Sequence, residues 1–505
     1  MSSSVVMQSD SPGGTGGGQF VRGLGLLDAT MIVAGSMIGS GIFIVSADIA
    51  RQTGGTGWLL LVWGLAGVLT LIAALSYGEL AAMMPQAGGQ YVYLREAYGP
   101  LWGFLYGWTL FLVIQTGTVA AVAVAFARFV GVLIPAVSET HVWLQAGRFS
   151  VSPATPVAIG AIGLLTAANC TGLHTGKWVQ NLFTLAKILS LIALIGLGLV
   201  VGANPTAIQA NFADWWTATL TQRAGSGSEA WVTVPHTGLS LALGLGTAMV
   251  GSLFASDAWQ SVAFAAGEVK NPRRNLPLSL GLGVGLVSLL YLAVNVVYLV
   301  TLPLVGNPQG ETALARGIQF AAQDRVGTAA AEVMFGPGAA VGMTVLIMIS
   351  TFGCMNGLIL AGARVYYAMA QDDLFFRPVG VLNRRGVPQN GLILQGLWAS
   401  VLAVSGTYSD LLDYVIFAVL LFYGLTMVGL FVLRRKRPEA PRPYRAFGYP
   451  VLPAFYVAAA SFIVATLLIS PKTRPNTWPG LALVLAGVPV YWLWSRYRRT
   501  VGPGQ

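Results

Sequence analysis

The residues best suited to bind a solute lie where the first long apolar segment of the chain is interrupted by glycine and serine. This interruption consists of Gly35, Ser36, Met37, Ile38, Gly39, Ser40 and Gly41. Lipid offers no hydrogen-bond partner, so unwound backbone at membrane depth is tolerated only where protein buries it or where it lines a cavity. The N–H groups that begin the outer half-helix suit a carboxylate, and the last carbonyl groups of the inner half-helix suit an ammonium. We therefore expect this stretch to bind both poles of a zwitterion.

A second interruption, from Gly251 to Trp259, falls in the sixth apolar segment and contains Asp257. An unpaired charge at mid-bilayer costs about 3 kcal/mol even on insertion scales. Asp257 must therefore pair with a substrate cation, a proton or a neighbouring helix, and the sequence leaves these three alternatives open. Phe254 could cover a bound substrate as a gate, or it could be an ordinary core aromatic.

A purely structural interpretation of the first interruption is an unbroken helix in which Gly35 and Gly39 form a packing face of small residues. Two interruptions in matching places of two halves of a chain are, however, typical of the binding site of a secondary transporter. The pair of interruptions favours broken helices over a packing face.

Lys187 is a third intramembrane charge of interest, because it lies mid-span and too deep to snorkel comfortably. Among exposed carbonyl groups its ammonium could occupy the place that a sodium ion takes in cation-coupled carriers. It could instead lose its proton when buried and couple transport to protons, or act as a fixed structural tether. Arg128 and Arg364 lie nearer span ends, where we expect them to snorkel or to bridge to loops.

Glu79 lies near the predicted cytoplasmic end of the second span. Glu268, Lys270, Arg273 and Arg274 flank the predicted inner end of the sixth. These charges could form a cytoplasmic latch that holds one state of a transporter closed. The alternative is ordinary solvated loop charge.

The elements that position these residues are membrane-spanning helices. The chain has 505 residues, of which 55% are hydrophobic and 9% charged, whereas soluble domains carry about 25% charged residues. A spanning helix needs about 20 apolar residues. Twelve segments are candidates, at roughly 24–50, 58–84, 101–134, 154–172, 177–202, 238–266, 276–303, 333–370, 390–406, 410–433, 450–470 and 478–495.

The distribution of lysine and arginine orients these spans. With a cytoplasmic N-terminus, 18 of the 28 basic residues fall on the inside, 7 on the outside and 3 within spans. This bias follows the positive-inside rule with both termini cytoplasmic. It also accounts for the net charge of +10 without nucleic acid as a partner. Two cysteines and three scattered histidines give no metal-ligand spacing, so we expect no metal and no cofactor.

The two interrupted segments are the first and the sixth, which predicts that spans one to five repeat, inverted, as spans six to ten. The predicted divisions are a flexible cytoplasmic tail over 1–22, a first five-helix repeat over 23–202, a second over 238–435, two further helices over 450–495, and a cytoplasmic tail over 496–505.

Several motifs taken together resemble the amino acid–polyamine–organocation superfamily, and within it the L-type amino acid transporter branch. The motifs are the interrupted segment Ala34 to Phe43, Tyr77-Gly78-Glu79-Leu80 followed by Pro85 to Leu94, Phe254 to Trp259, and Gly267 to Pro277. The resemblance extends from Gly23 to about Arg437.

The resemblance implies an all-α membrane protein with twelve spans and the leucine-transporter type of fold, with helices one and six broken. It implies that Ser40 and Gly41 bind the α-carboxylate of an L-amino acid through backbone N–H groups, with Gly35, Ser36, Met37 and Gly39 lining the site. Carbonyl groups at Phe254 and Ala255 would hold the α-amine, Phe254 would be the outer gate, and Lys187 would be the family's span-five lysine. Asp257 varies in the family, which leaves side-chain selectivity open.

Animal members of the branch bond to a heavy chain through a cysteine between spans three and four. The stretch from Pro135 to Pro153 has no cysteine, so we expect a chain that works alone, with no disulfide-linked heavy chain, whose partners are its substrate and membrane lipid. The resulting prediction is a sodium-independent exchanger of neutral L-amino acids in a bacterial-type cytoplasmic membrane. The alternatives are proton-coupled uptake, exchange of cationic amino acids and, from another class, a transporter-like sensor. The sequence shows no nucleophile–base pair and no phosphate-binding loop, so we do not expect an enzyme.

Overall fold

The computed structural model describes residues 22–139, 141–146, 149–224, 230–405 and 408–501. Of the tail predicted over 1–22, only Arg22 belongs to the described part. Residues 502–505 of the predicted C-terminal tail also lie outside it.

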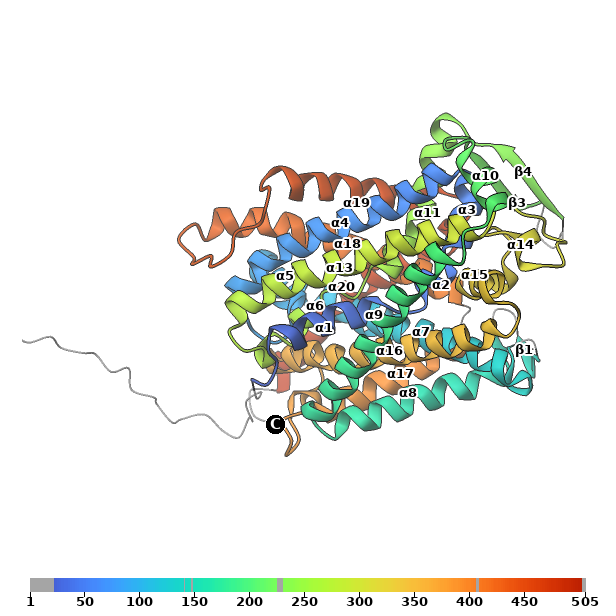
Figure 1. Ribbon diagram of the computed structural model, residues 1–505. Helices are drawn as coiled ribbons and strands as arrows, with labels where there is room; N and C mark the ends of the chain where they lie inside the picture. Colours follow the sequence, from blue (N-terminus) through green and yellow to red (C-terminus); the bar gives the residue numbers. More distant parts are fainter. Residues whose placement is uncertain (1–21, 140, 147–148, 225–229, 406–407, 502–505) are drawn as a thin grey trace, which may run out of the picture.

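The chain forms a bundle of helices that run side by side, with two small β-hairpins at one end (Figure 1). The helices of the first half are α1 (Leu26–Met37), α2 (Gly41–Ile44), α3 (Ser46–Thr53), α4 (Thr56–Met83), α5 (Gln90–Tyr98), α6 (Pro100–Thr109), α7 (Gln115–Leu133), α8 (Ala154–Cys170), α9 (Leu173–Val200) and α10 (Pro205–Phe212). Those of the second half are α11 (Gly238–Ala255), α12 (Ser261–Phe264), α13 (Pro272–Thr301), α14 (Ala313–Arg316), α15 (Val326–Phe335), α16 (Ala339–Gln371), α17 (Gln389–Ser405), α18 (Tyr408–Lys436), α19 (Val451–Ile469) and α20 (Arg474–Val501).

The hairpins are both antiparallel. β1 (Leu144–Ala146) pairs with β2 (Phe149–Val151), and β3 (Thr219–Arg223) pairs with β4 (Trp231–Pro235) in a register that places Thr221 opposite Thr233. Short 3₁₀ turns lie at Pro135–Val137, Ala266–Glu268, Ala322–Asp324 and Arg377–Gly380.

Ten helical segments within the described residues are long and apolar enough to cross a membrane. The fourth and ninth predicted spans correspond to α8 and α17, which are helices of 17 residues each. α20 continues to Val501, while the part of it that could cross a membrane is Arg474–Arg496.

The two longest predicted spans are both irregular. The third consists of α6, a π-helical turn at Leu110–Ile114, and α7, which together reach from Pro100 to Leu133. The eighth begins later than predicted, at Ala339, because Gly336, with φ of 84°, and Pro337 separate α16 from the short helix α15.

Close helix contacts are made possible by small residues, as expected for a membrane bundle. α13 packs along α4 and α1, and α16 packs along α7, α9 and α1. At Gly283 in α13, an added Cβ would lie 2.5 Å from Cγ1 of Val33 in α1, so only glycine permits this approach.

Backbone hydrogen bonds join the start of α1 to the segment that follows α12. The N–H groups of Gly23 and Leu24 donate to the carbonyl oxygen of Glu268 over 3.0 Å, and the N–H of Lys270 donates to the carbonyl oxygen of Leu24 over 2.8 Å. Leu24 and Val269 thus form a short parallel bridge, which joins the start of α1 to the segment between α12 and α13.

Candidate functional site

The first predicted interruption is a real break in the helix. α1 ends at Met37, Ile38 has the extended backbone angles φ −74° and ψ 93°, and α2 begins at Gly41. Val45, which joins α2 to α3, has helical angles, so the outer half is nearly continuous from Gly41 to Thr53. The alternative of an unbroken helix is therefore wrong, because Ile38 leaves the helical conformation.

Side chains from three other helices bond to the carbonyl groups that this break exposes. Cys354 Sγ donates to the carbonyl oxygen of Ser36 over 3.0 Å, and Ser350 Oγ lies 3.2 Å from that of Gly39. Both side chains come from α16, while Lys187 comes from α9 and Tyr291 from α13. A buried carbonyl group without a partner is costly, and these bonds satisfy the exposed backbone.

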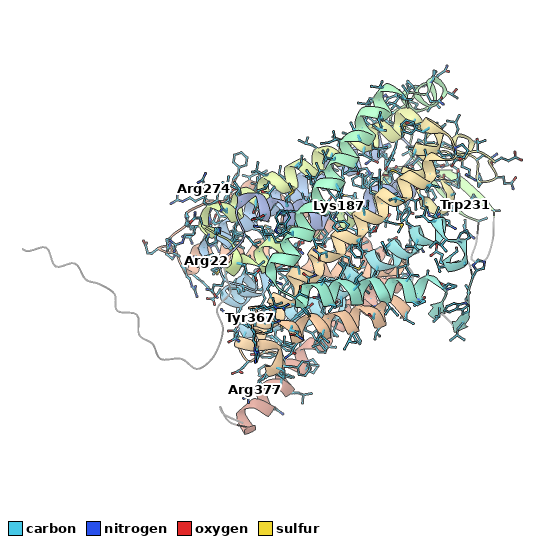
Figure 2. All side chains as sticks on the ribbon, turned by 60° about the horizontal axis from the view of Figure 1, so that its bottom comes forward. Arg22, Lys187, Trp231, Arg274, Tyr367 and Arg377 are labelled. Carbon is cyan, nitrogen blue, oxygen red and sulfur yellow. The ribbon has the colours of Figure 1, made fainter. Side chains whose placement is uncertain are left out.

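Lys187 provides the only charge among these partners within the described residues. Its Nζ donates to the carbonyl oxygens of Gly35 over 2.6 Å and of Ile38 over 2.8 Å. The side chain is buried, and Figure 2 shows it about midway between the end of the bundle with Arg22 and Arg274 and the end with Trp231. An ammonium group bonded to two main-chain carbonyl oxygens makes the kind of contacts that a small hydrated cation would otherwise supply.

The face of α16 against the break is made of small residues at helical spacing. An added Cβ on Gly353 would lie 2.9 Å from Cε of Lys187, and one on Gly357 would lie 2.7 Å from Oγ of Ser36. Residues separated by three or four positions share a helix face. The series Ser350, Gly353, Cys354 and Gly357 therefore forms one surface that fits against the break.

The second break begins later than the sequence predicts. α11 remains helical through Ala255, and only Ser256 to Gln260 leave the helix before α12 begins at Ser261. Gly251 does not unwind the helix; it allows close packing, because its added Cβ would lie 2.9 Å from Cβ of Val45. Ala258 has a φ of 67°, a left-handed conformation that strains a residue with a Cβ.

The two breaks are in direct contact. An added Cβ on Gly41 would lie 2.6 Å from Cβ of Ala255. The hydroxyl group of Tyr291 lies 2.9 Å from the carbonyl oxygen of Met37 and 3.2 Å from that of Ala255. One tyrosine therefore connects the end of α1 with the end of α11.

Asp257 is buried and is bonded to a neighbouring helix. The hydroxyl of Tyr423 in α18 donates to Asp257 Oδ1 over 2.6 Å. A small cavity adjoins this pair and is lined by residues of α4, α18 and α19 together with Ser256 and Trp259; none of its lining residues belongs to α1 or α2. The carboxylate thus has a partner in α18, and it borders this cavity, which Leu253 of α11 also lines.

Ser36 carries a hydroxyl group whose surroundings are unusual. Its Oγ is buried and has no hydrogen-bond partner among the described residues, although its own carbonyl group is bonded by Cys354. A buried polar atom without a partner costs about 1–3 kcal/mol. Ser36 lies in the last turn of α1, next to the break, where a ligand or a water molecule could bond to this atom.

The charges at the inner end of the bundle are paired rather than solvated. Glu268 and Arg364 are both buried and form an ion pair over 2.9 Å. Arg364 therefore does not snorkel; it bridges to the turn between α12 and α13, which is the other outcome expected for it. Its position on α16, against the segment after α12, buries the guanidinium beside a carboxylate. Arg128 likewise bridges to a loop residue, Glu139, over 2.6 Å.

Glu79 is enclosed by a second group of charges. Arg434 Nη2 lies 2.6 Å and Arg442 Nε 3.2 Å from its carboxylate, and the backbone N–H of Ala446 donates to it over 2.7 Å. Burial raises the pKa of the adjacent Tyr444 hydroxyl above its usual value, and the Glu79 carboxylate adds to this effect. The loop over 442–446 is therefore fixed on α4 by charge and by backbone.

All of the predicted site residues on the two breaks are buried, and Gly41 meets Ala255, whereas their binding roles stay predictions. The sequence interpretation did not find Tyr291, Ser350, Cys354 or Tyr423. For Ser350 and Cys354 a signal exists, since small and weakly polar residues recur at helical spacing in an apolar segment. For the tyrosines no local pattern distinguishes them from anchors or core aromatics.

Comparison with known proteins agrees with this geometry. Residues 24–493 match the family described as amino acid permease. The chain is 28% identical to the human b(0,+)-type amino acid transporter 1 over 482 residues, which cover 94% of this chain and 88% of the human protein. It is 28% identical to the human large neutral amino acids transporter small subunit 2 over 489 residues, covering 95% of this chain and 82% of that protein.

The prediction that the chain works without a disulfide-linked heavy chain is contradicted by these relatives. One of them is, by its name, the small subunit of a larger assembly. The physical reason for the error is that a missing cysteine between Pro135 and Pro153 bears only on a disulfide at that position. The two cysteines of the chain are free, but contacts between subunits need no covalent bond.

Proposed function

Because the chain belongs to the amino acid permease family, in the L-type branch of the amino acid–polyamine–organocation superfamily, we propose that it exchanges neutral L-amino acids by alternating access without sodium. It is a multi-pass membrane protein for amino acid transport and not an enzyme. The exchange mechanism, the substrate range and the roles of single residues form the proposal.

The observation that carries the proposal is the bonding of Lys187 to the first break. Its ammonium donates to the carbonyl oxygens of Gly35 and Ile38. A sodium ion would need such oxygen atoms as ligands, and here a fixed cation already bonds to them. A carrier with its cation attached to the chain gains nothing from a sodium gradient at this position.

The substrate would bridge the two breaks. The backbone N–H groups of Ser40 and Gly41 at the start of α2 would hold the α-carboxylate, since the first N–H groups of a helix have no partner within it. The unpartnered Oγ of Ser36 would add a donor, and Met37 and Gly39 would line the site. Carbonyl groups at Phe254 and Ala255 would hold the α-amine, with Phe254 above the substrate as the outer gate.

The proposed architecture has twelve spans with a five-plus-five inverted repeat over 23–202 and 238–435, followed by two helices over 450–495. The two breaks in the first and sixth spans support this arrangement, as broken helices in matching halves are typical of such folds. The positive-inside bias supports cytoplasmic termini, and a bacterial-type cytoplasmic membrane remains part of the proposal.

Proteoliposomes test the mechanism directly. An exchanger takes up labelled amino acid only when the vesicles are loaded with unlabelled substrate, and it does so equally in sodium and choline buffers. Accumulation in empty vesicles that follows an imposed pH gradient would overturn the exchanger and favour proton-coupled uptake. Counterflow with each neutral and cationic amino acid then defines the substrate range.

A second candidate rests on Asp257. The buried carboxylate borders a small cavity, and the side chain that bonds to it, Tyr423, carries a neutral hydroxyl. Asp257 could carry a proton during transport, or favour cationic amino acids. Preferential exchange of lysine or arginine would support the latter.

A further inference from the structure

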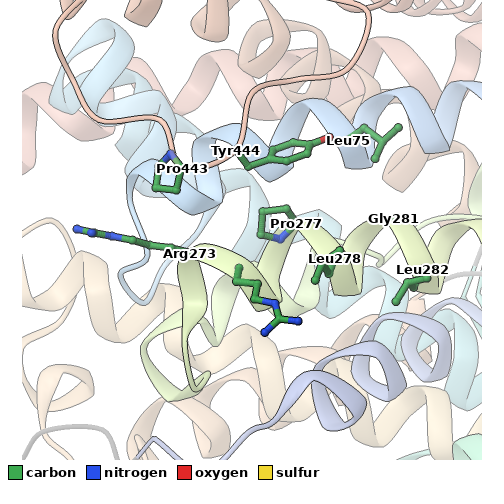
Figure 3. A pocket seen from close by; sticks show the side chains of 9 residues that line it. Leu75, Arg273, Pro277, Leu278, Gly281, Leu282, Pro443 and Tyr444 are labelled. Atoms are coloured by element: carbon green, nitrogen blue, oxygen red, sulfur yellow. The ribbon is translucent and has the colours of Figure 1, made fainter.

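A groove on the outside of the bundle, which no residue of either helix break lines, has the form of a ligand site. It has a volume of about 470 Å³ and lies between α4, the first turns of α13 and the loop that follows α18. Figure 3 shows Tyr444 and Leu75 on one side of it and Pro277, Leu278 and Leu282 along α13 on the other. We call it the α4–α13 groove.

The wall that α13 contributes is apolar and open to the surroundings. Leu278 is 40% exposed and Leu282 is 56% exposed. Gly281 widens the groove between them, because it has no side chain; an added Cβ would lie 3.3 Å from Cδ2 of Leu75. Exposed leucines on a membrane-spanning helix face lipid chains, and here they continue into a groove that a single chain can fill.

The other end of the groove is basic. Arg273 and Arg274 line it at the start of α13 and are both exposed, and no ion pair or hydrogen bond of either side chain is found within the described residues. Two buried acids at this end of the fold are already engaged: Glu268 pairs with Arg364, and Glu79 with Arg434 and Arg442. No carboxylate lines the groove.

We propose that the α4–α13 groove binds one anionic phospholipid from the membrane leaflet at this end of the bundle. Arg273 and Arg274 hold its phosphate group, and one acyl chain lies along Leu75, Leu278 and Leu282. Arginine suits phosphate because its guanidinium donates two parallel hydrogen bonds, and basic pockets between spanning helices recognise lipid headgroups. A zwitterionic headgroup fits less well, because its ammonium finds no acid in the groove.

The loop that lines the groove also contacts Glu79, so a lipid in the groove would affect the ion pairs of Glu79. Pro443 and Tyr444 line the groove, and the same loop provides Arg442 and the N–H of Ala446 to Glu79. An added Cβ on Gly78, next to Glu79 in α4, would lie 3.0 Å from Cε1 of Tyr444. A lipid packed on Tyr444 therefore stabilises the arrangement in which this loop encloses Glu79.

Native mass spectrometry of the purified full chain tests the proposal by counting bound lipids. The probes are 1-palmitoyl-2-oleoyl phosphatidylglycerol, the matching phosphatidylethanolamine, and soluble glycerol 3-phosphate. The test variants are Arg273→Gln/Arg274→Gln and Gly281→Leu, which fills the groove. The control is Arg384→Gln/Arg435→Gln, which removes the same charge from two other exposed arginines.

We expect one phosphatidylglycerol to bind at least about tenfold more weakly to the double arginine variant, which corresponds to a loss of roughly 1.4 kcal/mol. Gly281→Leu should also weaken it, whereas the control should match the unaltered chain. Equal binding to the double variant and the unaltered chain would overturn the proposal. So would equal weakening in the control, or competition by glycerol 3-phosphate as effective as that by the lipid, since the latter would mean a site for phosphate alone.

Discussion

The ammonium group of Lys187 lies 2.6 Å from the carbonyl oxygen of Gly35, so that a side chain of α9 is fixed on the broken backbone of the first span. With the second bond to Ile38, this charge holds the break in its unwound form. Loss of the charge should therefore disturb both the stability of the chain and transport.

Lys187→Ala should lower exchange by about tenfold or more and lower the thermal stability of the chain. Hydrogen bonds to charged groups contribute about 1.5–3 kcal/mol each, and the variant leaves the carbonyl oxygens of Gly35 and Ile38 without this donor. The vacated space can admit a small cation, so sodium should restore part of the lost stability. The measurements are counterflow and thermal unfolding in sodium and in choline.

Ser190→Ala is the matched control, since Ser190 bonds only within its own helix, to the carbonyl oxygen of Ala186. Normal exchange in Lys187→Ala would show that the break keeps its shape without the cation.

Tyr291→Phe removes the hydroxyl that lies between the carbonyl oxygens of Met37 and Ala255. We expect exchange to fall roughly fivefold to thirtyfold, the effect of about 1–2 kcal/mol, because the two breaks lose their shared partner. Tyr366→Phe provides the comparison, as the Tyr366 hydroxyl is buried without a partner among the described residues. Counterflow of both variants measures the difference, and equal rates would contradict a role for the bridge.

Gly41→Ala should abolish transport while leaving the chain folded. Its Cβ would lie 2.6 Å from Cβ and 2.9 Å from Cα of Ala255, and real Cβ atoms do not approach this closely, so the two breaks must move apart. Gly64→Ala in α4 is the control, because its added Cβ meets nothing within 4 Å. Size-exclusion profiles report folding and counterflow reports transport; full activity of Gly41→Ala would show that the breaks separate without cost.

Asp257→Asn tests selectivity. If the carboxylate faces a cationic substrate during transport, the ratio of lysine to leucine exchange should fall about tenfold while leucine exchange changes little. Tyr423→Phe removes the hydroxyl that lies 2.6 Å from Asp257, which should raise the same ratio by freeing the carboxylate. An unchanged ratio in both variants would leave Asp257 with a structural role only.

Glu79→Gln should destabilise the inner end of the bundle. Removing one partner of a buried ion pair costs about 3–5 kcal/mol, and here Arg434 and Arg442 both lose their carboxylate. Glu96→Gln breaks the partly exposed pairs with Arg95 and Arg437, where a loss of about 1 kcal/mol or less is expected for each. Thermal unfolding compares the two, and a larger effect at Glu96 would refute the assignment.

The sequence was sufficient to locate the first break, because glycine and serine clustered inside an apolar segment weaken the helix at a depth where lipid cannot bond to its backbone. It overestimated the second break, since Gly251 has the same composition signal but serves close packing against Val45. The placement of Lys187 beside carbonyl groups agrees with the sequence interpretation, while its role in coupling stays a prediction.

Other parts of the site depend on contacts between residues distant in the chain. Tyr291 and Tyr423 are single tyrosines in apolar helices, and only packing determines that they meet Met37 and Asp257. The burial of Arg364 was missed for the same reason. Its partner Glu268 lies in the turn between α12 and α13, and a position near the end of a predicted span suggests exposure unless that partner is known.

The parallel bridge between Leu24 and Val269 has a mechanical consequence. The start of α1 and the segment between α12 and α13 are linked by main-chain bonds, which do not depend on side-chain identity. We therefore expect α1 and α12 to move together as one unit when a passage opens at this end of the bundle. A cross-link between α1 and the segment after α12 should leave transport turnover intact. A cross-link from either of these two elements to α9 should stop turnover.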